Sequence, residues 1–164
     1  MYKILVFLDG SKFSLKFLKI ILFEPKFKKI GICVSKSKNS TFKRLSHLLL
    51  ELKQKKNSKI IYNFKENITK KLKTIFKKDK VDLIFSYYDK KINNKILSKL
   101  KIGGINFHPS YLPHNRGRHS TFWAIVNQTP LGASAHFMNN KFDDGPIIIR
   151  KKISDDGISD ASFY

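Results

Sequence analysis

The central segment of this chain reads Gly104-Ile105-Asn106-Phe107-His108-Pro109-Ser110-Tyr111-Leu112-Pro113. Asn106 and His108 are two residues apart at the end of an apolar run, so in a strand both side chains face the same way. Pro109 has no backbone N–H to offer a neighbouring strand, which predicts that the strand ends directly after His108. Because open α/β sheets bind ligands at the carboxyl ends of their strands, this polar pair is a candidate site.

A second polar turn, Phe142-Asp143-Asp144-Gly145, precedes another apolar run that begins at Pro146. We expect the carboxylate of Asp144 to join Asn106 and His108 at one crevice, which would bring together an amide donor, an imidazole and a carboxylate. The alternative is a capped strand followed by a proline-rich turn, in which His108 has only a structural role.

Apolar runs of strand length alternate with helical patterns along the whole chain. The expected strands are 3–8, 30–34, 59–62, 81–85, 105–107, 132–138 and 146–153, and the expected helices are 12–23, 42–56, 68–76, 94–100 and 121–127, with Ser11, Asn67 and Ser120 as caps. This alternation predicts an α/β fold with a mainly parallel sheet, flanked by helices and joined by right-handed crossovers. We expect a single domain over residues 1–164, with a C-terminal end that is short or truncated.

The composition indicates a globular protein, because 41% of the 164 residues are apolar and 14 of them are Phe. The single cysteine, Cys33, excludes an internal disulfide framework and a cysteine-based zinc cluster, and its apolar surroundings favour a buried structural residue. Lysines interrupt every hydrophobic stretch before it reaches a membrane-spanning length. We therefore expect a cytoplasmic protein that does not bind a membrane.

The chain is strongly basic, with 33 lysine and arginine residues against 12 aspartate and glutamate residues and a formal net charge of +21. Such a charge attracts nucleic acid, anionic lipid or phosphorylated small molecules. The lysines are scattered through helical patterns, which is more typical of a solvated surface than of a binding groove. Gly10-Ser11 lacks the triple-glycine spacing of a nucleotide-binding turn, so a plain tight turn is the better interpretation there.

The segment 106–113, followed by Arg116-Gly117 and then by Asp144-Gly145-Pro146-Ile147-Ile148, resembles the joint motif of the folate-dependent formyltransferases. The resemblance implies a Rossmann-like catalytic domain that transfers a formyl group from N10-formyltetrahydrofolate to an amine, without a metal. It also implies Asn106, His108 and Asp144 as the catalytic residues. The folate pocket that it implies consists of Phe85, Ser86, Tyr87, Tyr88, Asn140, Phe142, Asp143 and Asp144.

The run from Arg116 to Ile125 is similar to that of the nucleotide-sugar N-formyltransferases, which formylate an amino sugar carried on a nucleoside diphosphate. This similarity implies an acceptor site that includes Ser11, Arg116, Gly117 and Trp123. Phe122 and Trp123 are also expected to anchor a helix in the core. The high lysine content is not a trait of that family.

These residue types suit formyl transfer. The amide of Asn106 can donate to the oxyanion that forms when an amine attacks the formyl carbon. His108 can take part in the proton transfers or stabilise the oxyanion as the imidazolium, and Asp144 would orient it and favour its charged form.

Several alternatives stay open at this stage. Within the family, the acceptor could be methionyl-tRNA, glycinamide ribonucleotide or water, the last giving a formyltetrahydrofolate hydrolase. Outside the enzymes, the chain could be a degenerate basic domain that binds RNA. A metal cluster of His108, His114 and His119 is an alternative use of the loop histidines. A homodimer is compatible with any of the enzyme functions.

Overall fold

The computed structural model describes residues 1–9, 11–34, 61–63, 68–88 and 91–154. These residues belong to two compact units, Met1–Asn106 and Phe107–Tyr164. The single domain that we expect from the sequence is not tested by this division and stays a prediction. Within the described residues, no helix combines the length and the apolar character that crossing a membrane requires.

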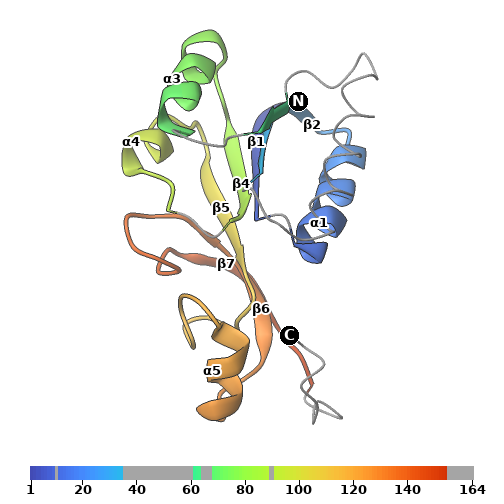
Figure 1. Cartoon of the computed structure of the whole chain (residues 1–164), viewed down its shortest axis with the longest axis vertical. Helices are drawn as coiled ribbons and strands as arrows, with labels where there is room; N and C mark the ends of the chain where they lie inside the picture. Colours follow the sequence, from blue (N-terminus) through green and yellow to red (C-terminus); the bar gives the residue numbers. More distant parts are fainter. Residues whose placement is uncertain (10, 35–60, 64–67, 89–90, 155–164) are drawn as a thin grey trace. The chain divides into compact units, whose positions relative to one another are not determined.

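The first unit is built on a parallel sheet (Figure 1). Its strands are β1 (Tyr2–Leu8), β2 (Phe27–Val34), β3 (Ile61–Asn63), β4 (Leu83–Tyr87) and β5 (Gly103–His108), whose last two residues belong to the second unit. They lie in the order β3-β2-β1-β4-β5. The central strand β1 is fully buried from Ile4 to Leu8, as expected for a continuous apolar run covered on both faces. The predicted α/β fold with a mainly parallel sheet is confirmed.

Among the residues that the structure describes, helix α1 (Lys12–Phe23) lies on one face of this sheet, and helices α3 (Ile68–Lys78) and α4 (Asn94–Leu97) lie on the other (Figure 1). Ser11 caps α1 as predicted, since its Oγ accepts a hydrogen bond from the Ser14 backbone N–H at 3.2 Å. Helical spacing places Phe13, Phe17, Leu18 and Ile21 on one face of this helix, and the last three are buried. Phe13 differs from the other three, because it is 47% exposed.

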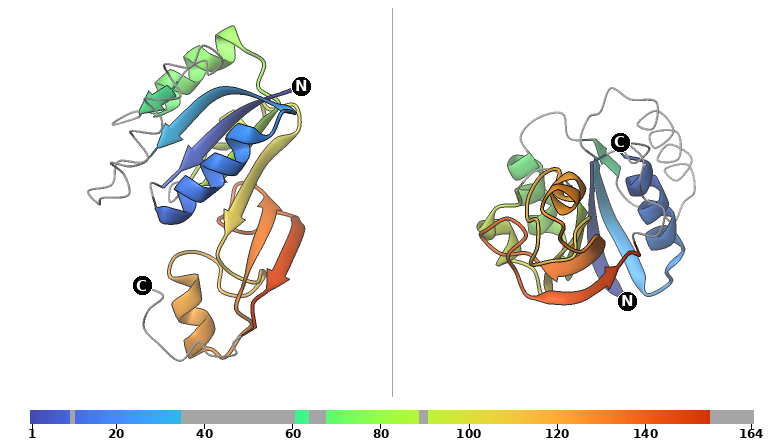
Figure 2. Two further views of the ribbon diagram at one scale, coloured as in Figure 1. Left: turned by 90° about the vertical axis from the view of Figure 1, so that its right-hand side faces the viewer. Right: turned by 90° about the horizontal axis from the view of Figure 1, so that it is seen from below.

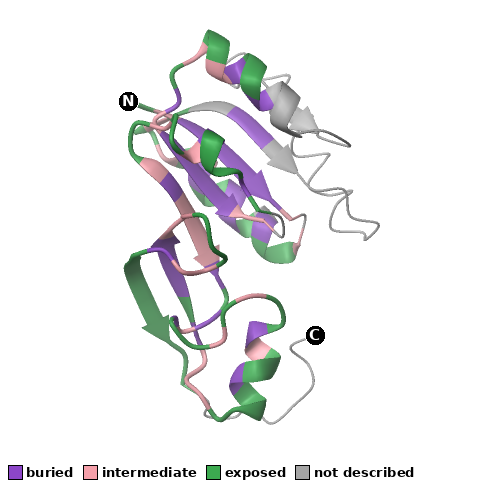
Figure 3. Cartoon of the chain, turned by 90° about the vertical axis from the view of Figure 1, so that its left-hand side faces the viewer, coloured by how far each residue is buried: buried purple, intermediate pink, exposed green. Residues whose placement is uncertain are grey.

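The second unit contains a short helix and an antiparallel pair of strands. The two strands lie side by side in Figure 2. They are α5 (Ser120–Val126), β6 (Gly132–Phe137) and β7 (Ile147–Lys152). The register of β6 shifts between Ala135 and His136, which marks an irregularity of the kind that re-aims a side chain. The face of β6 that carries Ser134 and His136 is buried, whereas all of β7 is exposed (Figure 3).

Two predictions about α5 are wrong. Ser120 is the first residue of the helix and not its cap, because its hydroxyl donates to the carbonyl oxygen of Pro109 at 2.9 Å, and left-handed His119 takes the cap position. Phe122 and Trp123 do not anchor the core, since they are 45% and 47% exposed and pack edge-on against each other. The buried side of this short helix carries small residues instead, Ser120 and Ala124.

The remaining differences concern element boundaries. The predicted strand 81–85 is shifted toward the C-terminus, to Leu83–Tyr87, and the helix expected over 94–100 ends at Leu97. Of the strand expected over 59–62, the structure describes the part from residue 61 onward, which belongs to Ile61–Asn63. Helix ends and strand ends depend on tertiary packing, which a local pattern does not contain. The predicted helix 42–56, the predicted cap Asn67 and the side chain of Cys33 lie outside the described residues.

Candidate active site

His108 lies at the end of β5, where the strand stops directly before Pro109 as predicted. Its side chain is 8% exposed, and its Nε2 lies 3.3 Å from the backbone oxygen of Asn115. Asn115 has a left-handed φ of 52°, which turns the following segment back toward the strand end. The imidazole is therefore held from one side by backbone and leaves Nδ1 for another partner.

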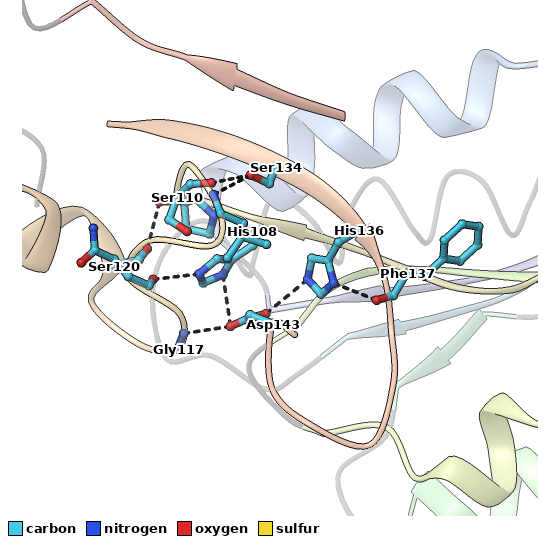
Figure 4. A network of polar contacts seen from close by, with 11 residues as sticks. His108, Ser110, Gly117, Ser120, Ser134, His136, Phe137 and Asp143 are labelled. Carbon is cyan, nitrogen blue, oxygen red and sulfur yellow. Dashed lines mark hydrogen bonds and ion pairs between the residues drawn. The ribbon is translucent and has the colours of Figure 1, made fainter. Parts of the chain in front are cut away.

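That partner is Asp143, in the turn between β6 and β7 (Figure 4). Its Oδ2 lies 3.5 Å from Nδ1 of His108 and accepts a hydrogen bond from the Gly117 backbone N–H at 2.9 Å. Its Oδ1 lies 3.4 Å from Nε2 of His136. Asp143 thus joins two histidines and one backbone donor, and its left-handed φ of 49° is the kind of backbone strain that is typical of functional sites.

Asp144 was predicted to face His108, but its carboxylate takes different partners. Its Oδ1 lies 2.8 Å from Nη1 of Arg116, and its Oδ2 lies 3.9 Å from Nζ of Lys141. Successive side chains in a turn point in different directions, so only one of two adjacent carboxylates can approach His108. The structure therefore assigns that contact to Asp143, which had been placed only in the folate pocket.

The environment shifts the pKa of both partners. Burial lowers the pKa of His108 below its usual 6.5 and outweighs the opposing effect of the Asp143 carboxylate. Burial by itself raises the pKa of Asp143, but the hydrogen bond from His136 and the charge of His108 bring its pKa below the usual 3.8. The pair thus favours a neutral imidazole beside an ionised carboxylate.

Asn106 lies on β5, where alternation places its side chain on the same face as that of His108. Its register partner on β4 is Ser86, one of the residues predicted to bind folate. Phe85 packs in the core against Phe17 and Phe27, with ring centroids 6.2 and 5.3 Å apart. Phe85 is therefore better described as a support for this strand end than as a lining residue.

The other predicted folate residues lie in separate parts of the chain. The ring of Tyr87 packs against that of Phe13 in a tilted arrangement, with ring centroids 4.4 Å apart, and burial, followed by the charge of Asp9, raises the pKa of Tyr87. Tyr88 packs edge-on against Phe7. In the second unit, Asn140 and Phe142 are exposed in the turn that carries Asp143. The folate pocket stays a prediction, because these residues belong to two units.

The four residues predicted to bind the acceptor have distinct surroundings. Ser11 is occupied as the cap of α1, and Gly117 holds Asp143 through its N–H. Arg116 is half exposed and paired with Asp144, while Trp123 is exposed on α5. Arg116 and Trp123 are the two of these with side-chain surface available to a ligand.

His136 is the residue of this network that the sequence analysis missed. Its side chain is 2% exposed and lies on the buried face of β6. A signal was present, since Ser134 and His136 occupy alternate positions of the strand and so share one face. In the part of the chain that the structure describes, no group of three or more His, Cys, Asp or Glu side chains is placed to hold a metal ion.

Comparison with known proteins identifies the class. The sequence model described as "Formyl transferase" matches residues 4–157, and the chain belongs to this family. It is 40% identical over 75 residues to a GDP-perosamine N-formyltransferase of Brucella melitensis, a match that covers 44% of this chain and 29% of that protein.

Two solved structures show the same fold. The phosphoribosylglycinamide formyltransferase of Bacillus halodurans has a TM-score of 0.68 at 18% identity, over 93% of this chain and 79% of the other. The formyltransferase PseJ of Anoxybacillus kamchatkensis, in complex with UDP-4,6-dideoxy-4-formamido-L-AltNAc and tetrahydrofolate, has a TM-score of 0.58 at 24% identity, over 93% and 60%. The matches thus cover less than two thirds of the length of the GDP-perosamine N-formyltransferase and of PseJ.

Proposed function

We propose that the protein transfers a formyl group from N10-formyltetrahydrofolate to the amine of a nucleotide-linked amino sugar. The observation that carries the proposal is the contact between His108 and Asp143, on a strand end that also presents Asn106. The curated relative supports a sugar acceptor, since it is named as a GDP-perosamine N-formyltransferase. The tetrahydrofolate and nucleotide sugar of the PseJ complex suit the same reaction class.

In this reaction the acceptor nitrogen attacks the formyl carbon, and a new carbon–nitrogen bond forms as the carbonyl becomes an oxyanion. The amide N–H of Asn106 would donate to that oxyanion, an interaction worth roughly 10²–10³ in rate. When the tetrahedral intermediate collapses, the bond to N10 of the folate breaks. The acceptor nitrogen has then lost one proton and N10 has gained one.

His108 is suited to move that proton. Its lowered pKa keeps the imidazole neutral at physiological pH, so it can accept the proton of the attacking amine and pass it to N10. The Asp143 carboxylate at 3.5 Å would stabilise the imidazolium that exists between these two steps. Asp143 thus takes the role that the sequence motif alone had assigned to Asp144.

We propose that Arg116 binds the phosphate groups of the acceptor. Its guanidinium is half exposed, and arginine recognises phosphate oxygens with paired N–H donors. Asp144 would hold this guanidinium in the free protein. The net charge of +21 favours the approach of a nucleoside diphosphate, which is an anion.

The test is a product assay with N10-formyltetrahydrofolate and a panel of acceptors: nucleotide-linked amino sugars, glycinamide ribonucleotide, methionyl-tRNA and water alone. We expect release of tetrahydrofolate coupled to formylation of a nucleotide-linked amino sugar. The proposed acceptor would be contradicted by formylation of glycinamide ribonucleotide or methionyl-tRNA, or by release of tetrahydrofolate that needs no amine. Each of these results would still agree with the formyl-transfer chemistry of the family. A cytoplasmic location, where nucleotide sugars and folates are found, belongs to the same proposal.

A further inference from the structure

The segment 109–117, between β5 and α5, brings two backbone groups to the candidate active site. The carbonyl oxygen of Asn115 lies 3.3 Å from Nε2 of His108, and the N–H of Gly117 donates to Oδ2 of Asp143 at 2.9 Å. Neither group belongs to a side chain, so its position follows the course of the backbone. Whatever fixes that course therefore also fixes the surroundings of His108 and Asp143.

Ser134 of β6 binds the segment through its hydroxyl group (Figure 4). This hydroxyl donates to the carbonyl oxygen of Ser110 at 2.7 Å and accepts a hydrogen bond from the backbone N–H of Leu112 at 3.0 Å. Both hydrogen bonds are buried. Removal of the hydroxyl would therefore leave a backbone donor and a backbone acceptor unpaired, which costs more than the loss of a contact at the surface.

Arg150 of β7 binds the same part of the segment from another strand. Its Nη1 donates to the carbonyl oxygen of Leu112 at 2.5 Å, and its guanidinium carbon lies 4.4 Å from the centroid of the Tyr111 ring. A guanidinium can do both at once, because it is planar and carries several N–H donors. Ser134 and Arg150 thus take the N–H and the carbonyl of one residue, Leu112.

The two ends of the segment have partners of their own. The hydroxyl of Ser120 donates to the carbonyl oxygen of Pro109 at 2.9 Å, and Nδ2 of Asn115 donates to Oγ1 of Thr129 at 2.5 Å. Those partners lie in α5 and directly after it, whereas Ser134 and Arg150 lie in β6 and β7. The middle of the segment is therefore tied to the strands that flank the turn of Asp143.

We infer that Ser134 and Arg150 are positioning residues, which fix the segment so that its two backbone groups reach the candidate active site. They act through the backbone of the segment and not by contact with the reacting atoms. The inference about position rests on the hydrogen bonds, and its consequence for turnover rests on the proposed function. A displacement of about 1 Å at a catalytic group can lower a rate roughly a hundredfold, so a small shift of the segment is sufficient.

The direct test measures hydrogen exchange of single backbone amides by NMR in Ser134→Ala. The amide of Leu112 loses its acceptor, and we expect its exchange to be faster by about tenfold or more. The amide of Gly117, further along the segment, should also exchange faster. The Phe137 amide, which donates to the Pro146 carbonyl at 2.9 Å, is the reference for general opening of this unit and should be unchanged. Faster exchange at Leu112 alone, at all three amides alike or at none of them would overturn the inference.

Ser110→Ala is the matched control. The hydroxyl of Ser110 belongs to the same segment, its residue is 2% exposed, and among the described residues this oxygen has no hydrogen-bond partner. The substitution thus removes the same group as Ser134→Ala without removing a hydrogen bond. We expect the amides of Leu112 and Gly117 to exchange within about twofold of the wild-type rate. An effect as large as that of Ser134→Ala would show that the two hydrogen bonds are not its cause.

Arg150→Met tests the second positioning residue, because it keeps most of the aliphatic stem and removes the donor. The exchange of the Gly117 amide should again be faster. Lys152→Met is the control for a lost charge, since Lys152 is an exposed cation of the same strand. Equal exchange rates in the two variants would overturn the role assigned to Arg150.

Steady-state kinetics connect the segment to the proposed function. Ser134→Ala should lower kcat by about tenfold or more and leave the KM for folate within about threefold, because misplacement at the site affects the transition state more than ground-state binding. Ser134→Thr, which keeps a hydroxyl, should recover most of the kcat. An unchanged kcat in Ser134→Ala would overturn the role in turnover. If the wild-type protein transfers no formyl group, the proposed function fails, while the exchange rates still decide whether the segment is positioned in this way.

Discussion

Oδ2 of Asp143 lies 3.5 Å from Nδ1 of His108. The adjacent carboxylate, Asp144, is turned to the guanidinium of Arg116 at 2.8 Å. Two neighbouring acidic residues of one turn are thus committed to different cations. If the proposed function holds, the first orients the base and the second holds a phosphate-binding arginine, and their substitutions should have different kinetic effects.

The two aspartates provide a matched pair of variants. Asp143→Asn should lower kcat by about a hundredfold or more, because the amide cannot stabilise an imidazolium at His108. Asp144→Asn should leave kcat within about threefold and act on the KM of the acceptor through Arg116. Steady-state kinetics of both variants, with circular dichroism as the control for folding, would check this. A larger loss of kcat in Asp144→Asn would restore Asp144 as the catalytic carboxylate.

Substitutions on β5 separate proton transfer from oxyanion stabilisation. His108→Asn should abolish turnover with little change in the Kd for folate, since proton movement affects the transition state and not ground-state binding. Asn106→Ala should raise the barrier by about 3 kcal/mol, the scale of one lost oxyanion donor. Single-turnover kinetics and calorimetric titration with a folate analogue would measure these effects. Turnover within threefold of wild type in a folded His108→Asn variant would refute the mechanism.

The stability of the protein should decrease on acidification in a range set by His108. Because its pKa is lower in the folded protein than the usual 6.5, the unfolded chain binds protons first as the pH falls. The free energy of unfolding should therefore drop below about pH 6.5, until the pH reaches the folded pKa of His108. Urea unfolding of wild type and His108→Asn across this range would measure the difference. The variant should have the shallower slope, and an equal slope in the two proteins would contradict the lowered pKa of His108.

Asp143 should make the free energy of unfolding depend on pH in a second, more acidic range. Its pKa in the folded protein lies below the usual 3.8, so its contribution is present above that pH and is lost as the pH falls below it. Asp143→Asn should remove this part of the slope. An equal slope in Asp143→Asn and wild type below about pH 4 would contradict the ionised state assigned to this carboxylate.

Two glycines of the site should respond differently to alanine. Gly145→Ala would place a Cβ 1.7 Å from the Phe137 carbonyl oxygen, so the backbone must move and we expect a loss of several kcal/mol, on the order of 3 or more. Gly117→Ala meets no atom within 4 Å and is opposed only by its φ of 86°, which should cost about 1–2 kcal/mol. Thermal and urea unfolding would compare them. Equal losses would show that the close packing at Gly145 is relieved by a small shift.

Local sequence patterns determined much of this protein. The apolar runs and their alternation with helical patterns predicted the parallel sheet, because burial of a strand on both faces requires a continuous apolar run. Pro109 determined where β5 ends, since it removes a backbone donor, and Ser11 determined the start of α1 through its side-chain acceptor. The motif around Asn106 and His108 identified the family before any contact was known.

The tertiary structure decided which carboxylate faces His108. Asp143 and Asp144 are chemically identical neighbours, and their side chains differ in direction because Asp143 has a left-handed φ of 49° and accepts from the Gly117 N–H, whereas Asp144 pairs with Arg116. It also placed His136 between Phe137 and Asp143, a contact between a strand and a turn that no local pattern contains. A sequence specifies residue types and their periodicity, whereas the direction of a side chain in a turn depends on the backbone conformation that packing imposes there.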